Sequence, residues 1–264
     1  MSTSPSRSIF ITGAAAGIGR AVAERFAKAG WFVGLYDVDE AAVQALRQQL
    51  GGDRAVSGRL DVSVAEDWAP QLAAFAQAAG RLDVLFNNAG VAVTSLFEEA
   101  PLARHHRLID INLKGVINGC HAGLPYLKQT PGSRVINMCS ASALFGQPML
   151  STYSATKAAV RSLTEALDIE WQRHGIRVLD VLPLFVNTAM VRDEVSKMKT
   201  VKTLGVHLSA DDVAQTVWAL ARPESAQGLA VHSPVGLQTK LFYVAAKLTP
   251  DSWNRWITAK LGGH

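Results

Sequence analysis

The sequence has few cysteines, no long hydrophobic run and no signal-peptide pattern. Its two cysteines, Cys120 and Cys139, form no CxxC pair, which excludes a disulfide framework. No stretch of 18 apolar residues is present, so no transmembrane helix is predicted. The first eight residues, MSTSPSRS, are polar and contain no apolar core of the kind that a signal peptide requires. These absences lead us to expect a cytoplasmic protein.

Clustered basic residues and metal-binding motifs are also lacking. The net charge is +4, but the 26 Lys and Arg residues are dispersed and form no nucleic-acid-binding motif, so no nucleic-acid partner is expected. The seven His residues form no HExxH motif and no Cys/His ligand spacing, so no metal is expected. The absence of a G-x-S-x-G nucleophile elbow argues against a hydrolase with an α/β layer structure.

What is present is a regular alternation of short apolar runs and amphipathic helical patterns. The predicted strands are residues 8–12, 31–36, 55–60, 82–87, 133–138, 176–182 and 228–232. The predicted helices between them are residues 17–29, 39–50, 65–79, 101–128 and 152–173. Such alternation produces right-handed βαβ units and a parallel sheet covered on both faces. The sequence therefore predicts an α/β fold, a single Rossmann-type doubly wound parallel sheet of about seven strands.

A glycine-rich turn, TGAAAGIG, follows the first predicted strand. Glycines permit a tight turn, and the N-terminus of the following helix offers free N–H groups to a pyrophosphate. The spacing differs from the common G-x-G-x-x-G fingerprint, but the strand before and the helix after provide the required context. The predicted dinucleotide-binding residues of this turn are Gly13, Ala16, Gly17, Ile18 and Gly19, and a plain tight turn is the alternative.

Asp37 ends the second predicted strand, 18 residues beyond Gly19. A carboxylate at this place binds the adenosine ribose hydroxyls and repels a 2′-phosphate. No Arg or Lys that could accept such a phosphate occurs among the neighbours Ala14, Ala15, Ala16, Val38 and Asp39. The sequence therefore favours NAD over NADP, and the alternative is that Asp37 is a turn residue or a helix cap.

Tyr153 and Lys157 lie four residues apart in the run YSATKAAV, whose alanines favour a helix. This spacing places both side chains on one helical face. A neighbouring ammonium lowers the pKa of a phenol from its usual value of about 10, so such a Tyr could exchange protons near neutral pH. A surface pair without catalytic function is the alternative.

The chain also carries NNAG at residues 87–90, Asn112 and Ser140, in order with the motifs above. With them it resembles the short-chain dehydrogenase/reductase family from residue 8 to about 190, and weakly at 210–232. The resemblance implies an NAD(H)-dependent oxidoreductase that interconverts a secondary alcohol and a ketone. The alternatives are an NADP(H)-dependent carbonyl reductase of the same fold and a non-enzymatic dinucleotide-binding sensor or scaffold.

The resemblance also implies a role for each catalytic residue. Tyr153 would be the acid or base, and Lys157 would lower its pKa and bind the nicotinamide ribose. Ser140, 13 residues before Tyr153, would donate a hydrogen bond to the substrate oxygen. Asn112 would hold a water in the proton relay.

Further binding residues follow from the same resemblance. Asp61 and Val62 would hold the adenine, and the remaining cofactor residues would be Asn88, Ala89, Gly90, Pro183, Val186 and Thr188, beside Tyr153 and Lys157. The substrate side would include Ser142, Leu184 and Phe185 within a mainly apolar pocket. Leu184 stands where the family usually has Gly, so we expect an altered turn or a φ angle that Leu tolerates.

Three parts of the chain are expected: a disordered N-terminus (1–7), a dinucleotide-binding and catalytic domain (8–235) and a helical extension (236–264). The extension contains two amphipathic patterns, 237–248 and 251–261, with interleaved Lys and Arg. It could pack on the domain, form a subunit contact, cap the pocket or make a peripheral membrane contact. By resemblance we expect a homodimer or homotetramer.

Overall fold

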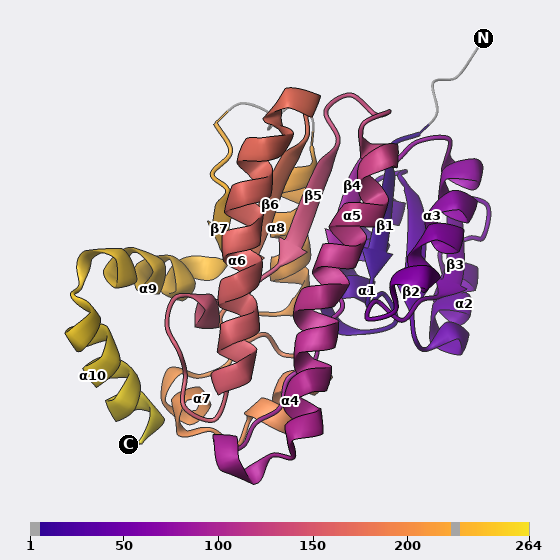
Figure 1. Ribbon diagram of the computed structural model, residues 1–264. Coiled ribbons are helices and arrows are strands. Elements are labelled where there is room, and N and C mark those ends of the chain that lie inside the picture. Colours follow the sequence, from indigo (N-terminus) through magenta and orange to yellow (C-terminus); the bar gives the residue numbers. More distant parts are fainter. Residues whose placement is uncertain (1–5, 223–227, 264) are drawn as a thin grey trace.

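A computed structural model gives the structure of the protein and describes residues 6–222 and 228–263. Within these residues, seven parallel strands form one sheet with the order β3-β2-β1-β4-β5-β6-β7 (Figure 1). The strands are β1 (Ser8–Thr12), β2 (Phe32–Asp37), β3 (Ala55–Arg59), β4 (Val84–Asn87), β5 (Arg134–Met138), β6 (Arg177–Leu182) and β7 (His232–Pro234). The predicted fold class is confirmed. The expected disorder of residues 1–5 lies outside the described residues.

Helices cover both faces of the sheet (Figure 1). They are α1 (Gly17–Lys28), α2 (Glu40–Gln49), α3 (Ala65–Ala79), α4 (Leu102–Ile109), α5 (Gly115–Leu127), α6 (Ser151–Trp171), α7 (Lys199–Leu204), α8 (Ala210–Ala221), α9 (Gly236–Leu248) and α10 (Asp251–Gly262). Successive side chains of strand β1 point to opposite faces of the sheet and pack against the helices on each face. Ile9 and Ile11 pack with Phe26 of α1, whereas Phe10 packs with Trp68 of α3. The strand order reverses direction between β1 and β4, which is where doubly wound sheets bind ligands.

Two predicted elements differ from the structure. The helical pattern at 101–128 is interrupted by a π-helical segment, Asp110–Lys114, between α4 and α5. Within this segment the side chain of Asn112 makes two hydrogen bonds with the backbone of Val91. The strand predicted at 228–232 is shifted, because Leu229 packs into the core and ladder pairing with β6 begins only at His232.

His232, at the start of β7, joins two carboxylates beneath the sheet edge. Its Nδ1 lies 2.8 Å from Asp180 Oδ2 and its Nε2 lies 2.7 Å from Glu165 Oε1. Arg161 bonds the same Glu165 oxygen at 3.0 Å. Burial alone lowers the pKa of His232, but the hydrogen bonds and charge of Asp180, with Glu165, outweigh burial and raise the pKa above 6.5. The imidazolium is thus favoured in the folded protein.

This cluster predicts a pH-dependent stability. A raised imidazole pKa stabilises the fold fully below the unfolded-state value of 6.5, and the stabilisation is lost as the pH rises through the folded-state pKa. We expect the free energy of unfolding to fall as the pH rises above 6.5. In His232→Gln the fall should be smaller, and stability at pH 6 should drop by about 2 kcal/mol, because hydrogen bonds to charged groups are lost.

Urea unfolding at a series of pH values measures this effect. His106→Gln, at an exposed position of α4, is the control and should keep the wild-type pH profile. An unchanged pH profile in His232→Gln would refute the assignment of the imidazolium.

Candidate active site

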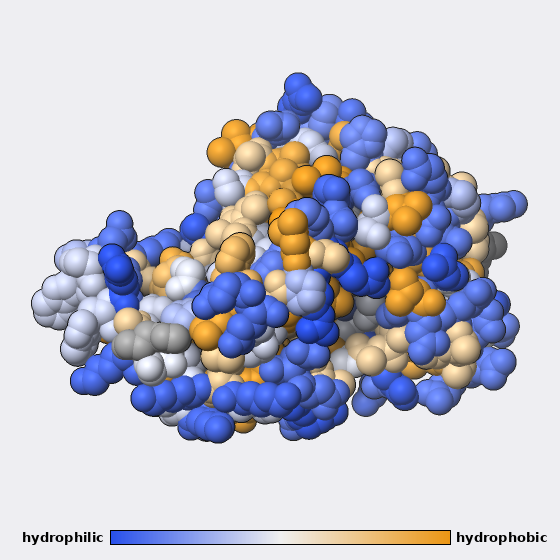
Figure 2. All heavy atoms as spheres, turned by 60° about the horizontal axis from the view of Figure 1, so that its bottom comes forward, coloured by the Kyte–Doolittle hydropathy of each residue, from blue (hydrophilic) through white to orange (hydrophobic). Residues whose placement is uncertain are grey.

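The largest concentration of predicted site residues lies in one cleft at the carboxyl ends of β1, β2, β4, β5 and β6. Figure 2 turns this edge of the molecule forward and shows hydrophobic residues gathered toward the middle of the face, with mainly hydrophilic residues along its lower rim. We call this cleft at the carboxyl ends of the strands the main cleft. Its lining residues are Gly13, Ala16, Gly17, Ile18, Asp37, Asn88, Ala89, Gly90, Met138, Cys139, Ser140, Tyr153, Lys157, Pro183, Leu184, Val186, Thr188, Ala189, Met190 and Val191.

The glycine turn forms the floor of the main cleft at the start of α1. Gly13 and Gly17 have φ angles of +67° and +54°, which L side chains rarely adopt. A Cβ atom at Gly19 would overlap the Gly13 carbonyl oxygen and Asn88 Nδ2, so Gly19 is a packing glycine beneath the turn. Helix α1 has no side-chain cap and no acid in its first turn. Its N–H groups and positive dipole end are therefore available to a phosphate.

Asn88 and Thr12 fasten this turn to the end of β4. Asn88 Nδ2 donates to the carbonyl oxygens of Thr12 and Gly13 at 2.9 and 3.1 Å. Thr12 Oγ1 in turn accepts from the backbone N–H groups of Asn88 and Ala89, at 3.0 and 3.1 Å. Asn88 thus borders the cleft and also holds the glycine turn in its shape.

The carboxylate of Asp37 borders the cleft at the end of β2. Its Oδ2 accepts from Ala15 N at 3.1 Å and its Oδ1 accepts from Asp39 N at 3.1 Å. These bonds fix the carboxylate and leave each oxygen with a further lone pair for a ribose hydroxyl. Of the described residues that line the cleft, Lys157 is the one that carries a basic side chain.

Asp61 and Val62 do not line the main cleft. Asp61 Oδ1 accepts from Ser63 N and Oγ, at 3.0 and 2.6 Å, and these bonds lower its pKa. Val62 is buried, and its carbonyl oxygen accepts from Trp68 and Asn118. The structure therefore places these two residues in a turn beside the cleft, and Gly19 beneath it.

Tyr153 and Lys157 share one face of α6 inside the cleft, with Lys157 Nζ 5.6 Å from the Tyr153 ring centroid. Lys157 Nζ donates to the Met138 carbonyl oxygen at 2.8 Å. Burial raises the pKa of Tyr153 to about 12, against the opposing hydrogen bond of Ser140. Burial also lowers the pKa of Lys157 to about 8. The lowering of the phenol pKa that was expected from Lys157 is not among these effects: burial has the largest influence on the pKa of Tyr153, and the hydrogen bond of Ser140 is the one that lowers it.

Ser140 and Ser142 meet next to the phenol. Ser142 Oγ donates to Ser140 Oγ at 2.9 Å, and Ser142 N donates to the same oxygen at 3.3 Å. Both bonds leave the Ser140 hydroxyl proton free to point toward Tyr153 or a ligand oxygen. Ser140 lines the main cleft, whereas Ser142 faces only the neighbouring side pocket described below.

Asn112 lies behind the cleft, fully buried in the π-helical segment. Its Oδ1 accepts from Val91 N at 2.8 Å and its Nδ2 donates to Val91 O at 2.9 Å. Both amide groups are thus used by the backbone. A Cβ atom at Gly90 would lie 3.2 Å from Asn112 Oδ1 and 3.7 Å from Lys157 Nζ, so both side chains lie close to the backbone of Gly90.

Two smaller hollows adjoin the main cleft, and Leu184 borders all three. The side pocket is lined by Ala92, Ser140, Ser142, Gln147, Leu150, Tyr153, Leu184, Phe185, Met190, Val191 and Val195. All three predicted substrate residues line it. Among the described residues, Met149 is the one non-glycine residue with a positive φ angle, so Leu184 adopts a φ that Leu tolerates.

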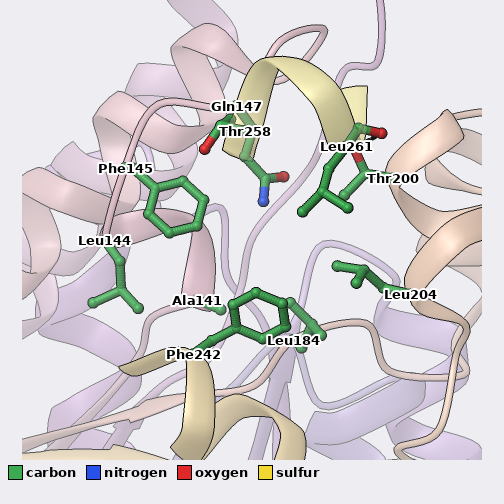
Figure 3. A pocket seen from close by; sticks show the side chains of 10 residues that line it. All are labelled: Ala141, Leu144, Phe145, Gln147, Leu184, Thr200, Leu204, Phe242, Thr258 and Leu261. Carbon is green, nitrogen blue, oxygen red and sulfur yellow. Dashed lines mark hydrogen bonds between the residues drawn. The ribbon is translucent and has the colours of Figure 1, made fainter. Parts of the chain in front are cut away.

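The inner pocket lies where the C-terminal helices meet the body of the protein (Figure 3). It is lined by Ala141, Leu144, Phe145, Gln147, Leu184, Thr200, Leu204, Phe242, Thr258 and Leu261. Gln147 borders both the side pocket and the inner pocket, and it is only 7 % exposed. Its Oε1 atom has no hydrogen-bond partner within the described chain.

Sequence reasoning missed Gln147 and the cleft residues Met138, Cys139, Ala189 and Val191. The one available signal for Gln147 was a single amide in the otherwise apolar run ALFGQPML. Cys139 gave no signal, because a buried thiol is usually a packing residue. Here its Sγ lies 3.3 Å from the Lys157 carbonyl oxygen, at the edge of the cleft.

Comparison with known proteins agrees with this geometry. Residues 7–199 match the family model described as short chain dehydrogenase. The chain is 37% identical over 189 residues to 3-beta-hydroxysteroid dehydrogenase of Comamonas testosteroni, covering 71% of this chain and 74% of that protein. It is 35% identical over 182 residues to D-threitol dehydrogenase of Mycolicibacterium smegmatis, covering 68% and 70%.

A solved structure extends the similarity to the fold. The 3-ketoacyl-(acyl-carrier-protein) reductase of Brucella melitensis, complexed with NADH, superimposes with a TM-score of 0.80 at 28% sequence identity. The match covers 87% of this chain and 96% of that protein.

Proposed function

This chain belongs to the short-chain dehydrogenase family, and we propose that it interconverts a secondary alcohol and a ketone with NAD(H). The observation that carries the proposal is the meeting of Ser140, Tyr153 and Lys157 in the cleft floored by the glycine turn. An NADP(H)-dependent enzyme and a non-enzymatic dinucleotide sensor remain the alternatives. The complete Ser, Tyr and Lys set argues for catalysis.

The glycine turn, the uncapped start of α1 and Asp37 fit a dinucleotide. The turn and α1 would hold the pyrophosphate, and Asp37 would bind the adenosine ribose. Lys157 would bind the nicotinamide ribose, with Pro183, Val186 and Thr188 around the ring. When bound, the nicotinamide supplies the hydride donor or acceptor.

Tyr153 and Ser140 act on the substrate oxygen in this proposal. A phenol with a pKa of about 12 is protonated at neutral pH, so Tyr153 is ready to donate its proton to a ketone oxygen. Ser140, whose oxygen already accepts from Ser142, donates its hydrogen to the same oxygen and stabilises the developing charge. In alcohol oxidation Tyr153 would first have to give up its proton, so that the phenolate can accept the proton of the alcohol, with Ser140 bonded to the same oxygen.

Lys157 returns a proton to Tyr153. The Lys157 pKa of about 8 lies below the pKa of the phenol and close to neutral pH. The ammonium could therefore pass a proton on to the phenolate and then take one up from solvent. Since both amide groups of Asn112 bind Val91, Asn112 acts as a positioning residue that holds the loop beside Lys157. A water in the relay would have to use the backbone of the π-helical segment, where π-bulges often serve function.

Gln147 suggests the substrate class. The side pocket is apolar except for the serines, Tyr153 and Gln147. A buried amide oxygen without a partner is costly, and a ligand donor would relieve that cost. We therefore propose an apolar alcohol or ketone with a second hydrogen-bonding group, such as a hydroxyl, at some distance from the reacting carbon.

Gln147→Met tests this substrate class, because Met has a similar shape but no amide. For substrates with a second hydroxyl we expect KM to rise about tenfold, the loss of roughly one buried hydrogen bond. For matched substrates without that hydroxyl, KM should stay within about twofold. Gln129→Met, on an exposed loop, is the control, and an equal effect on both substrates would contradict the assignment.

A panel of cyclic and linear secondary alcohols and ketones, followed by NADH absorbance, tests the proposed reaction itself. We expect turnover of at least one apolar member with NAD(H), and faster turnover than with NADP(H). Binding of NADH without turnover of any member would instead favour the sensor alternative.

The remaining parts of the proposal concern organisation. We propose that residues 8–235 form the dinucleotide-binding and catalytic domain and that 236–264 form an extension that closes the inner pocket. No helix in the described ranges is long and apolar enough to cross a membrane. A cytoplasmic location and a homodimer or homotetramer remain part of the proposal.

A further inference from the structure

Helix α9 carries an exposed apolar stripe. Leu237, Leu241, Val244 and Leu248 follow one another at spacings of four, three and four residues, which places them on one helical face. Each side chain is between 54 and 78 % exposed. A helix that packed on the protein through its apolar stripe would bury these residues. In the folded protein the stripe instead stays exposed to solvent.

Helix α10 adds two exposed tryptophans. Trp253 and Trp256 are 64 and 62 % exposed, whereas Trp31, Trp68 and Trp171 are buried. Lys260 lies one turn beyond Trp256, with its Nζ 4.9 Å from that ring. Exposed Trp beside Lys is the composition of a helix that lies at a membrane interface.

The charge of this segment is strongly one-sided. Residues 236–264 contain Lys240, Lys247, Arg255 and Lys260 but only one acid, Asp251, which gives +3 of the net +4 of the whole chain. Lys240 and Lys247 lie along one side of the stripe on α9. On an anionic membrane surface the apolar stripe could be buried, and the lysines beside it would lie close to negative charges.

The opposite faces of the two helices hold them to the body. Phe242 of α9, and Thr258 and Leu261 of α10, line the inner pocket with Leu184 and Leu204 (Figure 3). Figure 1 shows the two helices projecting as an arch beyond β7, with α10 returning toward α7. The arch is anchored through this inner side, and the stripe and tryptophans lie on other faces.

We propose that the exposed faces of α9 and α10 dock the protein on an anionic lipid surface. A second copy of the chain is the other occupant that such a stripe would accept. The charges argue against it, since α9 contains no acid, and pairing two such faces would bring Lys240 and Lys247 close to their own copies. Lipid headgroups of negative charge are attracted by the same lysines.

Co-sedimentation of the full chain with vesicles tests the proposal. With phosphatidylglycerol and phosphatidylcholine vesicles we expect binding that weakens with salt, and little binding with phosphatidylcholine alone. Leu241→Asp/Val244→Asp should lower the partition constant at least tenfold, and so should Lys240→Glu/Lys247→Glu. Tryptophan emission should shift to the blue on binding, and Trp253→Phe/Trp256→Phe should lose that shift.

Ile169→Asp is the control, because Ile169 is 71 % exposed on α6, away from the arch. It should bind as the wild type does. Equal binding by wild type and Leu241→Asp/Val244→Asp, or no binding to either vesicle, would overturn the proposal. A wild-type dimer that Leu241→Asp converts to a monomer would also overturn it, by assigning the face to a second copy. None of these measurements depends on the enzymatic activity.

Discussion

Tyr153→Phe is expected to lower kcat for ketone reduction by about 10³-fold, within the range of general acid catalysis. The substitution removes the proton that the phenol donates to the substrate oxygen and keeps the ring that fills the cleft. Because the other proposed cofactor-binding residues are untouched and the ring is kept, the dissociation constant for NADH should change less than about threefold. Steady-state kinetics and NADH fluorescence titration measure the two quantities separately.

Tyr126→Phe, on α5 outside the cleft, is the matched control and should retain wild-type kcat. Near wild-type turnover by Tyr153→Phe would assign the proton transfer to another group. Equal loss of turnover and of NADH binding would show that Tyr153 acts through cofactor binding.

Asp37→Ala is expected to reverse the cofactor preference in part. The wild type should bind NADH more tightly than NADPH, because Asp37 accepts ribose hydroxyls and repels a 2′-phosphate. Removal of a charged hydrogen-bond acceptor costs roughly 1.5–3 kcal/mol, so NADH binding should weaken about tenfold to hundredfold. NADPH binding should stay constant or improve. Titrations with both cofactors give the ratio.

Asp39→Ser provides the comparison for Asp37→Ala. Asp39 caps α2 by accepting from Ala42 N at 3.0 Å, and Ser can make the same cap. This variant removes one carboxylate from the same loop but should leave the cofactor ratio unchanged. Tighter binding of NADPH than of NADH by the wild type would disprove the role of Asp37.

Most of the sheet could be predicted because its strands are buried on both faces. Such strands are short, mainly apolar runs between turns, as in SIFIT and, with more polar residues, SRVINM. The edge strand β7 is different. The apolar run at 228–232 reflects core packing of Leu229, and the paired residues that follow include Ser233 and Pro234. Because the residues of β7 that pair at the sheet edge are not an apolar run, the position of this strand could not be predicted from the sequence.

The site was predictable where a motif stands at a strand end or, for Tyr153 and Lys157, on one face of a helix. The glycine turn, Asp37, Ser140, Tyr153 and Lys157 all border the main cleft. Effects that depend on burial or on distant packing were not predictable. These include the raised pKa of Tyr153, the use of the Asn112 amide by Val91, and the unpartnered Gln147 amide.

Leu184 is a further residue whose role in the structure could not be predicted from the sequence. Its replacement of the usual Gly predicted an altered turn or a φ angle that Leu tolerates, and the structure gives it no positive φ. What the substitution changes is space, since Leu184 borders the main cleft, the side pocket and the inner pocket. No local sequence pattern predicts that one residue borders three pockets.

In the proposed reaction, hydride moves within the main cleft between the carbinol carbon of a secondary alcohol and the nicotinamide ring. The most direct test uses an alcohol substrate deuterated at the carbinol carbon, with NAD⁺ and wild-type protein, followed by mass spectrometry of the cofactor. We expect one deuterium in the nicotinamide ring of the NADH formed, and none with Tyr153→Phe over the same time. Ketone formation without deuterium in the cofactor would contradict it.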